Sequence, residues 1–256
     1  MAKVHVLIVC APGTNCEFET AHAWQLAGAT TRIVRVDELI ADPGLLEGSQ
    51  ILTLPGGFCY GDDIAAGKIL AAEMNLFLAD ALRAFVDAGK LILGVCNGFQ
   101  VLVKMGLLPG GRLGDAAVTI ASNTSGRYED RWVYIKPSAT RCHFIDGDGL
   151  IYLPIAHAEG RVVARDESAL ADLGREGHVA FTYVDAEGRE GPYPVNPNGS
   201  MGSVAGLVDE TGQVLGLMPH PERNAHLTNH PRWTRLCRDR EPDGLRLFKT
   251  AVARMR

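Results

Sequence analysis

A cysteine between a buried strand and a helix is the first feature that could carry chemistry. Cys96 follows the apolar run Leu91–Val95 and precedes a helical pattern that starts at Asn97. A nucleophile at such a turn is held in a tight conformation above the sheet, and a helix N-terminus favours the thiolate. The N–H of Asn97 would then point to where an acyl oxyanion forms. A buried structural cysteine before a helix would give the same pattern.

A second segment, Leu54-Pro-Gly-Gly-Phe58, also stands at the end of a predicted strand. The backbone N–H of Gly57 could complete an oxyanion hole with Asn97, although a plain β-turn would explain the same residues. Asp62 and Asp63 follow closely. Two adjacent carboxylates could bind a metal, but we expect them to cap a helix.

The third segment is Met218-Pro-His220-Pro-Glu222, after the predicted strand Gln213–Leu217. A residue before proline is pushed to an extended conformation, and residues i and i+2 of an extended chain point to the same side. His220 and Glu222 can therefore approach each other, so that the carboxylate orients the imidazole as a base.

Three further segments are less decisive. Pro12–Glu17 could bind an anion, but a turn capped by Thr14 or Asn15 is expected. The polar segment Asn123–Trp132 suits an active-site wall, a partner surface or a solvated loop. His157-Ala-Glu159 could form a second His/Glu site, but a turn at the end of a strand is expected.

The elements that must position these residues alternate between strand and helix patterns up to about residue 117. Such alternation is typical of an α/β fold with a parallel sheet. From Val118 onward the strand patterns are joined by turns, which indicates a more antiparallel region. Predicted strands are Val4–Val9, Thr31–Val36, Gln50–Leu54, Leu91–Val95, Val118–Ala121, Trp132–Ile135, Ile151–Ala156, Arg161–Ala164, His178–Val184, and the hairpin Ser203–Val208 with Gln213–Leu217. The predicted helices are Cys16–Ala27, Met74–Ala88, Asn97–Met105 and Leu245–Met255. In the first, Phe18, Ala21, His22 and Leu26 recur at helical spacing, and the second has Leu76 and Leu78 among its apolar positions.

Length and composition limit the class of protein. The chain has 256 residues, and we expect a single domain over 1–256, because α/β folds often reach this size as one unit. A net charge of −5 shows no nucleic-acid footprint, and no apolar run approaches the ~20 residues of a membrane helix. The N-terminus lacks a signal-peptide pattern, so a soluble cytoplasmic protein is expected. Six scattered cysteines form no C-x-x-C pair, so we expect no structural metal.

Taken together, the Cys96 turn, the Gly-Gly turn and His-Pro-Glu resemble class I (triad-type) glutamine amidotransferases. More narrowly, the blocks PGTNCE, LPGGFCYGDD, GVCNGFQVL, NTSGRYEDRW, AHAEG and MPHPERN resemble the glutaminase subunits of phosphoribosylformylglycinamidine synthases. The resemblance spans nearly the whole chain, and six blocks in order are highly specific. Glu17 departs from it, because the family more often has Asp there.

The resemblance implies a flavodoxin-like, mostly parallel sheet flanked by helices, with an antiparallel excursion. It implies Cys96 as nucleophile, His220 as general base and acid, and Glu222 as the carboxylate that orients it. Gly57 and Asn97 would supply the oxyanion-hole N–H groups, and Gln100 would lie near the bound glutamine. The implied reaction is hydrolysis of L-glutamine through a thioester on Cys96.

The resemblance also implies partners. Ammonia would pass to a large synthetase subunit, which binds ATP and magnesium and amidates formylglycinamide ribonucleotide in purine biosynthesis. A small adaptor subunit is expected, and no cofactor in this chain. Two other interpretations stay open. One is another Cys-dependent hydrolase or an amidotransferase with a different acceptor, against which PGTNC and RYEDRW argue. The other is a catalytically silent binding subunit, which usually lacks one of the three triad residues, whereas all three are present here.

Overall fold

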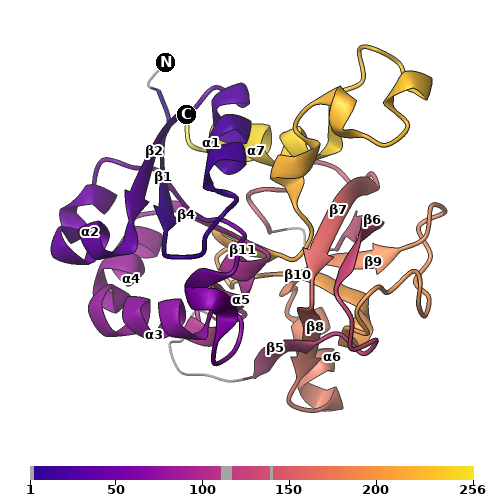
Figure 1. Cartoon of the computed structure of the whole chain (residues 1–256), viewed down its shortest axis with the longest axis horizontal. Coiled ribbons are helices and arrows are strands. Elements are labelled where there is room, and N and C mark those ends of the chain that lie inside the picture. The colour runs from indigo at the N-terminus through magenta and orange to yellow at the C-terminus, as the bar shows by residue number, and fades with distance from the viewer. Residues whose placement is uncertain (1–2, 111–116, 139–140) are drawn as a thin grey trace.

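A nine-stranded mixed sheet runs through the molecule (Figure 1). The structure is a computed structural model and describes residues 3–110, 117–138 and 141–256. The strand order is β2-β1-β3-β4-β11-β10-β9-β6-β7, and a separate two-stranded sheet pairs β5 with β8. The strands are β1 His5–Cys10, β2 Thr30–Arg35, β3 Ile51–Leu54, β4 Leu91–Val95, β5 Val118–Ser122, β6 Glu129–Pro137, β7 Ile151–His157, β8 Glu159–Ala164, β9 Val179–Val184, β10 Val204–Val208 and β11 Val214–Leu217.

The half of the sheet formed by β2-β1-β3-β4-β11 is parallel throughout. Numbered along this half, the order is the 2-1-3-4-5 of flavodoxin-like folds. Every residue of β3, β4 and β11 is buried, as expected for parallel strands covered on both faces. The predicted flavodoxin-like fold is therefore confirmed.

The other half is antiparallel, as the turn-rich sequence after Val118 predicted. Strands β10, β9, β6 and β7 continue the same sheet with antiparallel pairing. The predicted hairpin is formed by β10 and β11. Helix α6 was not predicted; it begins after Asp166, whose carboxylate accepts the Ala169 N–H at 2.8 Å. No helix within the described residues is long and apolar enough to cross a membrane.

Two of the predicted helices differ from the structure. In α1 the residues buried are Thr20, Ala21, Ala23 and Trp24, whereas Phe18 is 72% exposed and His22 and Leu26 are also exposed. Trp24 decides the orientation, because its ring packs edge-on against Phe248 of α7 and its Nε1–H donates to Thr53 Oγ1 at 3.0 Å. Of the four residues whose helical spacing predicted one face of this helix, only Ala21 is buried. The helices are α1 Glu17–Leu26, α2 Val36–Ala41, α3 Lys68–Phe77, α4 Ala79–Asp87, α5 Asn97–Met105, α6 Glu167–Arg175 and α7 Asp243–Arg254.

The single helix predicted over Met74–Ala88 is also wrong. The chain forms α3 and α4, separated at Leu78, whose φ is −122° and ψ is 0°. Leu78 is fully buried, as are Met74 on α3 and Leu82 on α4, whereas Leu76 is 75% exposed. A change of direction at Leu78 lets both helices bury an apolar face, which one straight helix over these residues does not do.

The pairing of β4 with β11 positions the site. These strands are parallel neighbours, with Val95 opposite Leu217, so the segments that follow them leave the sheet at the same end. The Cys96 N–H donates to Leu217 O at 2.8 Å. Segments far apart in the sequence, one beginning at Cys96 and one leading to His220, therefore start side by side.

Candidate active site

Cys96 has the strained backbone expected of a nucleophile at a strand–helix turn. Its φ is 51° and its ψ is −103°, a conformation that costs a non-glycine residue on the order of 1–3 kcal/mol. Gly98 allows the turn, because a Cβ there would lie 1.9 Å from Leu54 O. A Cβ on Gly94 would likewise lie 2.6 Å from Gly98 O. The two glycines therefore let α5, the strand–helix turn at Cys96 (hereafter the elbow) and the neighbouring strand pack closely.

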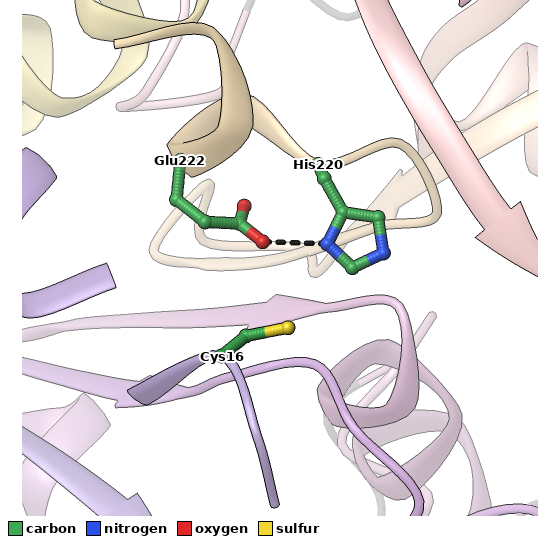
Figure 2. Close-up of side chains that lie close together, drawn as sticks. All are labelled: Cys16, His220 and Glu222. Carbon is green, nitrogen blue, oxygen red and sulfur yellow. Dashed lines mark hydrogen bonds and ion pairs between the residues drawn. The ribbon is translucent and has the colours of Figure 1, made fainter. Parts of the chain in front are cut away.

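His220 and Glu222 form a buried pair (Figure 2). His220 Nδ1 and Glu222 Oε1 are 2.5 Å apart, and the two residues are 2% and 4% exposed. His220 is extended, with φ −100° and ψ 93°, and its N–H donates to Pro154 O on β7 at 2.8 Å. The short 3-10 helix Pro221–Asn224 then turns Glu222 back to the ring. The predicted approach of these two side chains is confirmed.

The electrostatic surroundings of His220 favour the imidazolium. Burial opposes the charged ring, but the Glu222 carboxylate and the sulfur of Cys96 hold the pKa of His220 well above its usual value. The Cys96 thiol itself donates to Ala156 O at 3.7 Å. Within the described chain His220 Nε2 is buried without a hydrogen-bond partner. This nitrogen is therefore available to exchange a proton.

The Gly-Gly turn lies against the elbow and is held from two sides. The Cys59 N–H donates to Asn97 Oδ1 at 3.2 Å, which ties the turn to the start of α5. On the other side, the Phe58 N–H donates to Gly13 O at 2.9 Å. Gly57 has φ +149°, and a Cβ there would meet Asn15 N at 2.8 Å. The N–H of Asn97 opens α5, where backbone donors have no helical acceptor.

Gln100 is committed to a buried network. Its Oε1 accepts from Asn97 Nδ2 at 2.9 Å and its Nε2 donates to Glu159 O at 2.5 Å. The same Asn97 amide donates to Asp62 Oδ1 at 3.0 Å. Asp62 therefore braces the elbow. The predicted helix cap by Asp62 or Asp63 was wrong, since α3 begins after Gly67 without a side-chain cap.

The turn Pro12–Glu17 connects the Gly-Gly turn to the His-Glu pair. The predicted cap by Thr14 or Asn15 was wrong, because α1 has no side-chain cap and Thr14 Oγ1 accepts instead from the Ala11 N–H at 3.0 Å. The N–H of Cys16 donates to Gly56 O at 3.3 Å. Figure 2 shows the Cys16 side chain reaching toward His220 and Glu222 from the opposite segment.

Cys16, His220 and Glu222 offer ligand atoms within 4.8 Å of one another, a spacing that could suit a metal ion. However, Arg223 Nη2 donates to Cys16 Sγ at 3.0 Å, and the thiol itself donates to Asn15 Oδ1 at 3.2 Å. Burial raises the pKa of Cys16. A protonated thiol beside a guanidinium opposes a cation, so these contacts favour a hydrogen-bonded bridge. The sequence did not predict the hydrogen bond between Cys16 and Arg223, although Cys16 lies within the PGTNCE segment.

The remaining candidate segments are also placed. His157 ends β7 and its Nδ1 bonds Asn123 Oδ1 at 3.1 Å, so the expected strand-end turn is confirmed. The carboxylate of Glu159 accepts the Ala66 N–H at 3.3 Å. Tyr128, from the polar segment Asn123–Trp132, lies near the site: burial and the neighbouring Cys96 raise its pKa. An active-site wall stays a prediction for this segment.

In this parallel sheet one strand ends in a thiol at a strand–helix turn, and the segment after the adjacent strand carries a His-Glu pair. This combination defines the class of triad-type glutamine amidotransferases. The family model described as "CobB/CobQ-like glutamine amidotransferase domain" matches residues 3–254. A phosphoribosylformylglycinamidine synthase subunit PurQ from Dehalococcoides mccartyi is 44% identical over 255 residues, with 98% of each chain covered. One from Methanococcus maripaludis is 44% identical, covering 89% of this chain and 85% of the relative.

A solved structure indicates the same family as these relatives. A chain of PurLQS from Thermotoga maritima matches with a TM-score of 0.75 and 29% identity, and both chains are covered completely. The chain belongs to the PurQ family of phosphoribosylformylglycinamidine synthase subunits, within the glutamine amidotransferases.

Proposed function

We propose that this chain hydrolyses L-glutamine to glutamate and ammonia and supplies the ammonia to a synthetase subunit of the same complex. In that complex, formylglycinamide ribonucleotide is converted to the amidine with ATP. The observation that carries the proposal is that the parallel neighbours β4 and β11 bring two features to the same end of the sheet: Cys96 at its strained turn and the segment with the buried His220–Glu222 pair. The names of the relatives, subunits of phosphoribosylformylglycinamidine synthase, support this acceptor.

The proposed reaction assigns a step to each of these residues. The Cys96 sulfur attacks the side-chain amide carbon of glutamine, and the N–H groups of Gly57 and Asn97 hold the oxyanion. His220 then gives a proton to the departing nitrogen, so that ammonia leaves and a γ-glutamyl thioester remains. A water molecule, deprotonated by the same ring, hydrolyses the thioester. Removing one oxyanion-hole donor from an acyl-transfer enzyme typically costs about 10²–10³ in kcat.

The partners and conditions are part of the same proposal. A large synthetase subunit would bind ATP and magnesium, and a small adaptor subunit would complete the complex; the PurLQS relative supports a multisubunit assembly. Gln100 would lie near the bound glutamine, with its own amide held by Asn97 and Glu159 O. The hydrogen-bonded state of Cys16 supports a reaction that needs no cofactor in this chain. We place the reaction in the cytoplasm.

The test compares two nitrogen sources in the reconstituted complex. Cys96→Ala should abolish amidation with glutamine and leave amidation with ammonium salts intact, because only glutamine hydrolysis needs the thiolate. Cys142→Ala is the matched control, since Cys142 is an equally buried cysteine far along the chain from the elbow. Equal loss with both nitrogen sources would make Cys96 a structural residue and refute the proposal.

A further inference from the structure

The segment between the His-Pro-Glu turn and α7 is strongly basic in an otherwise acidic chain. Between His226 and Arg240 it contains Arg232, Arg235, Arg238 and Arg240 but only one acidic residue, Asp239, while the whole chain has a net charge of −5. It begins beyond β11 and lies near β7 at the end of the sheet (Figure 1). None of the chemistry proposed above uses these arginines.

This segment closes a cavity of about 290 Å³ against β6 and β7. Tyr134 and Tyr152 form one wall, with ring centroids 4.4 Å apart. His230 packs beside Tyr152 at 5.3 Å. Arg232 and Arg235 border the opening, and both are exposed. The cavity therefore combines flat aromatic faces with two cationic side chains.

The guanidinium groups at the opening are unneutralised. Over residues 3–110, 117–138 and 141–256, neither Arg232 nor Arg235 forms an ion pair or a side-chain hydrogen bond, whereas Arg240 contacts both carboxylate oxygens of Asp243 at 3.1 and 3.2 Å. Asp243, the only acidic residue of the lining, also accepts the Tyr152 N–H at 3.0 Å. Its charge is therefore already compensated, and the field at the opening favours an anion.

His230 adds a neutral donor. Burial and the nearby Arg240 and Arg232 lower the pKa of His230, so the ring is uncharged at neutral pH. Its Nδ1 accepts the Arg232 N–H at 3.0 Å, which leaves the proton on Nε2. A ligand in the cavity would thus meet two arginine forks, which suit phosphate oxygens, and one imidazole donor. It would also meet Tyr134, which among the described residues packs against no aromatic ring except Tyr152 and so leaves its other side for a planar base.

We propose that this cavity binds a nucleoside mono- or diphosphate, with the phosphate between Arg232 and Arg235 and the base against Tyr134. Its volume is close to the lower limit of ~300 Å³ for small-molecule sites and suits a single nucleotide better than an extended acidic peptide. The site is separate from the triad, since its lining includes neither Cys96, His220 nor Glu222.

The test is isothermal titration calorimetry of the purified full-length chain with AMP, ADP and inorganic phosphate. AMP or ADP should bind more tightly than phosphate. Arg232→Gln combined with Arg235→Gln should weaken nucleotide binding at least tenfold. Tyr134→Leu should weaken nucleotide binding but leave phosphate binding unchanged. Arg165→Gln combined with Arg175→Gln is the matched control, because these arginines are exposed elsewhere and already contact carboxylates; nucleotide binding should not change.

Three results would overturn the proposal. The first is no nucleotide binding at millimolar concentration. The second is phosphate binding as tight as AMP binding and insensitive to Tyr134→Leu, which would mean an anion patch alone. The third is a double arginine variant that binds nucleotide normally but no longer assembles with the synthetase subunit, which would make the segment a protein interface. Thermal unfolding of each variant checks that the fold is retained.

Discussion

The guanidinium of Arg223 donates a hydrogen bond to the Cys16 sulfur at 3.0 Å, although the two residues come from opposite ends of the chain. Arg223 follows Glu222 directly, and Cys16 belongs to the turn whose backbone holds Gly56. The contact therefore joins the segment that carries His220 and Glu222 to the Gly-Gly turn. It makes Cys16 a positioning residue in our account, not a second nucleophile.

Cys16→Ser should accordingly retain most glutaminase turnover, because a hydroxyl can accept from Arg223 and donate to Asn15 as the thiol does. Cys16→Ala should lower turnover by roughly tenfold, since a hydrogen bond to a charged donor contributes about 1.5–3 kcal/mol. The measurement is the rate of thioester formation in the complex. A complete loss in Cys16→Ser would give Cys16 a chemical role.

An electrophilic glutamine analogue should label Cys96 and spare the other buried cysteines. Burial raises the pKa of Cys16, of Cys59 to about 11 and of Cys142 to about 12, so these thiols remain protonated and weakly nucleophilic. Peptide mapping after partial labelling identifies the modified residue. A main adduct on Cys59 or Cys16 would contradict the assignment of the nucleophile.

Glu222→Gln should keep the fold and slow thioester formation, because an amide can hold the ring but stabilises the imidazolium poorly. The loss in the rate of thioester formation should be smaller than the ~10⁴-fold loss of kcat for the corresponding Asp→Asn change in a serine protease, because a cysteine nucleophile depends less on its base. His220→Ala should be the more severe variant, because it also removes the acid for ammonia. Pre-steady-state kinetics in the complex measure the rate of thioester formation in both variants. Thioester formation and hydrolysis at the wild-type rate in Glu222→Gln would mean that Glu222 is only structural.

Gly57→Ala should abolish most glutamine-dependent activity while ammonium-dependent activity of the complex persists. Its φ of +149° is rarely adopted by other residues, and the added Cβ would lie 2.8 Å from Asn15 N and Thr14 Cα. The oxyanion donor would therefore be displaced. Gly48→Ala is the control, since a Cβ there meets nothing within 4 Å. Full glutamine turnover in Gly57→Ala would remove this turn from the mechanism.

Acid should destabilise the fold partly through His157. Burial lowers the pKa of this ring from 6.5 to about 3, with His220 adding repulsion. The unfolded chain then binds the proton more readily, so the contribution to stability is complete above pH 6.5 and falls as the pH drops toward 3. Each pH unit costs at most about 1.4 kcal/mol from this group. Urea unfolding measures the pH dependence of the free energy of unfolding in the wild type and in His157→Asn, whose amide can replace the Nδ1–H donor. Identical pH slopes in the two proteins would show that His157 does not contribute.

The fold class and the triad could be predicted because both depend on local patterns. Continuous apolar runs mark buried parallel strands, and prolines on both sides of His220 fix an extended segment. Contacts between distant segments could not be predicted in this way. The inward face of α1 depends on where Thr53 and Phe248 lie relative to Trp24, and the role of Cys16 depends on Arg223.

The adjacency of β4 and β11 has a consequence for how the protein is made. Residues 96–213 are synthesised between these two strands, so the buried strand Leu91–Val95 is made long before its neighbour Val214–Leu217. Until then β4 presents one unpaired apolar edge, which favours aggregation. The same late step that covers this edge brings the base to the nucleophile. We therefore expect a chain that ends before β11 not to consume glutamine, because it lacks the segment that carries His220.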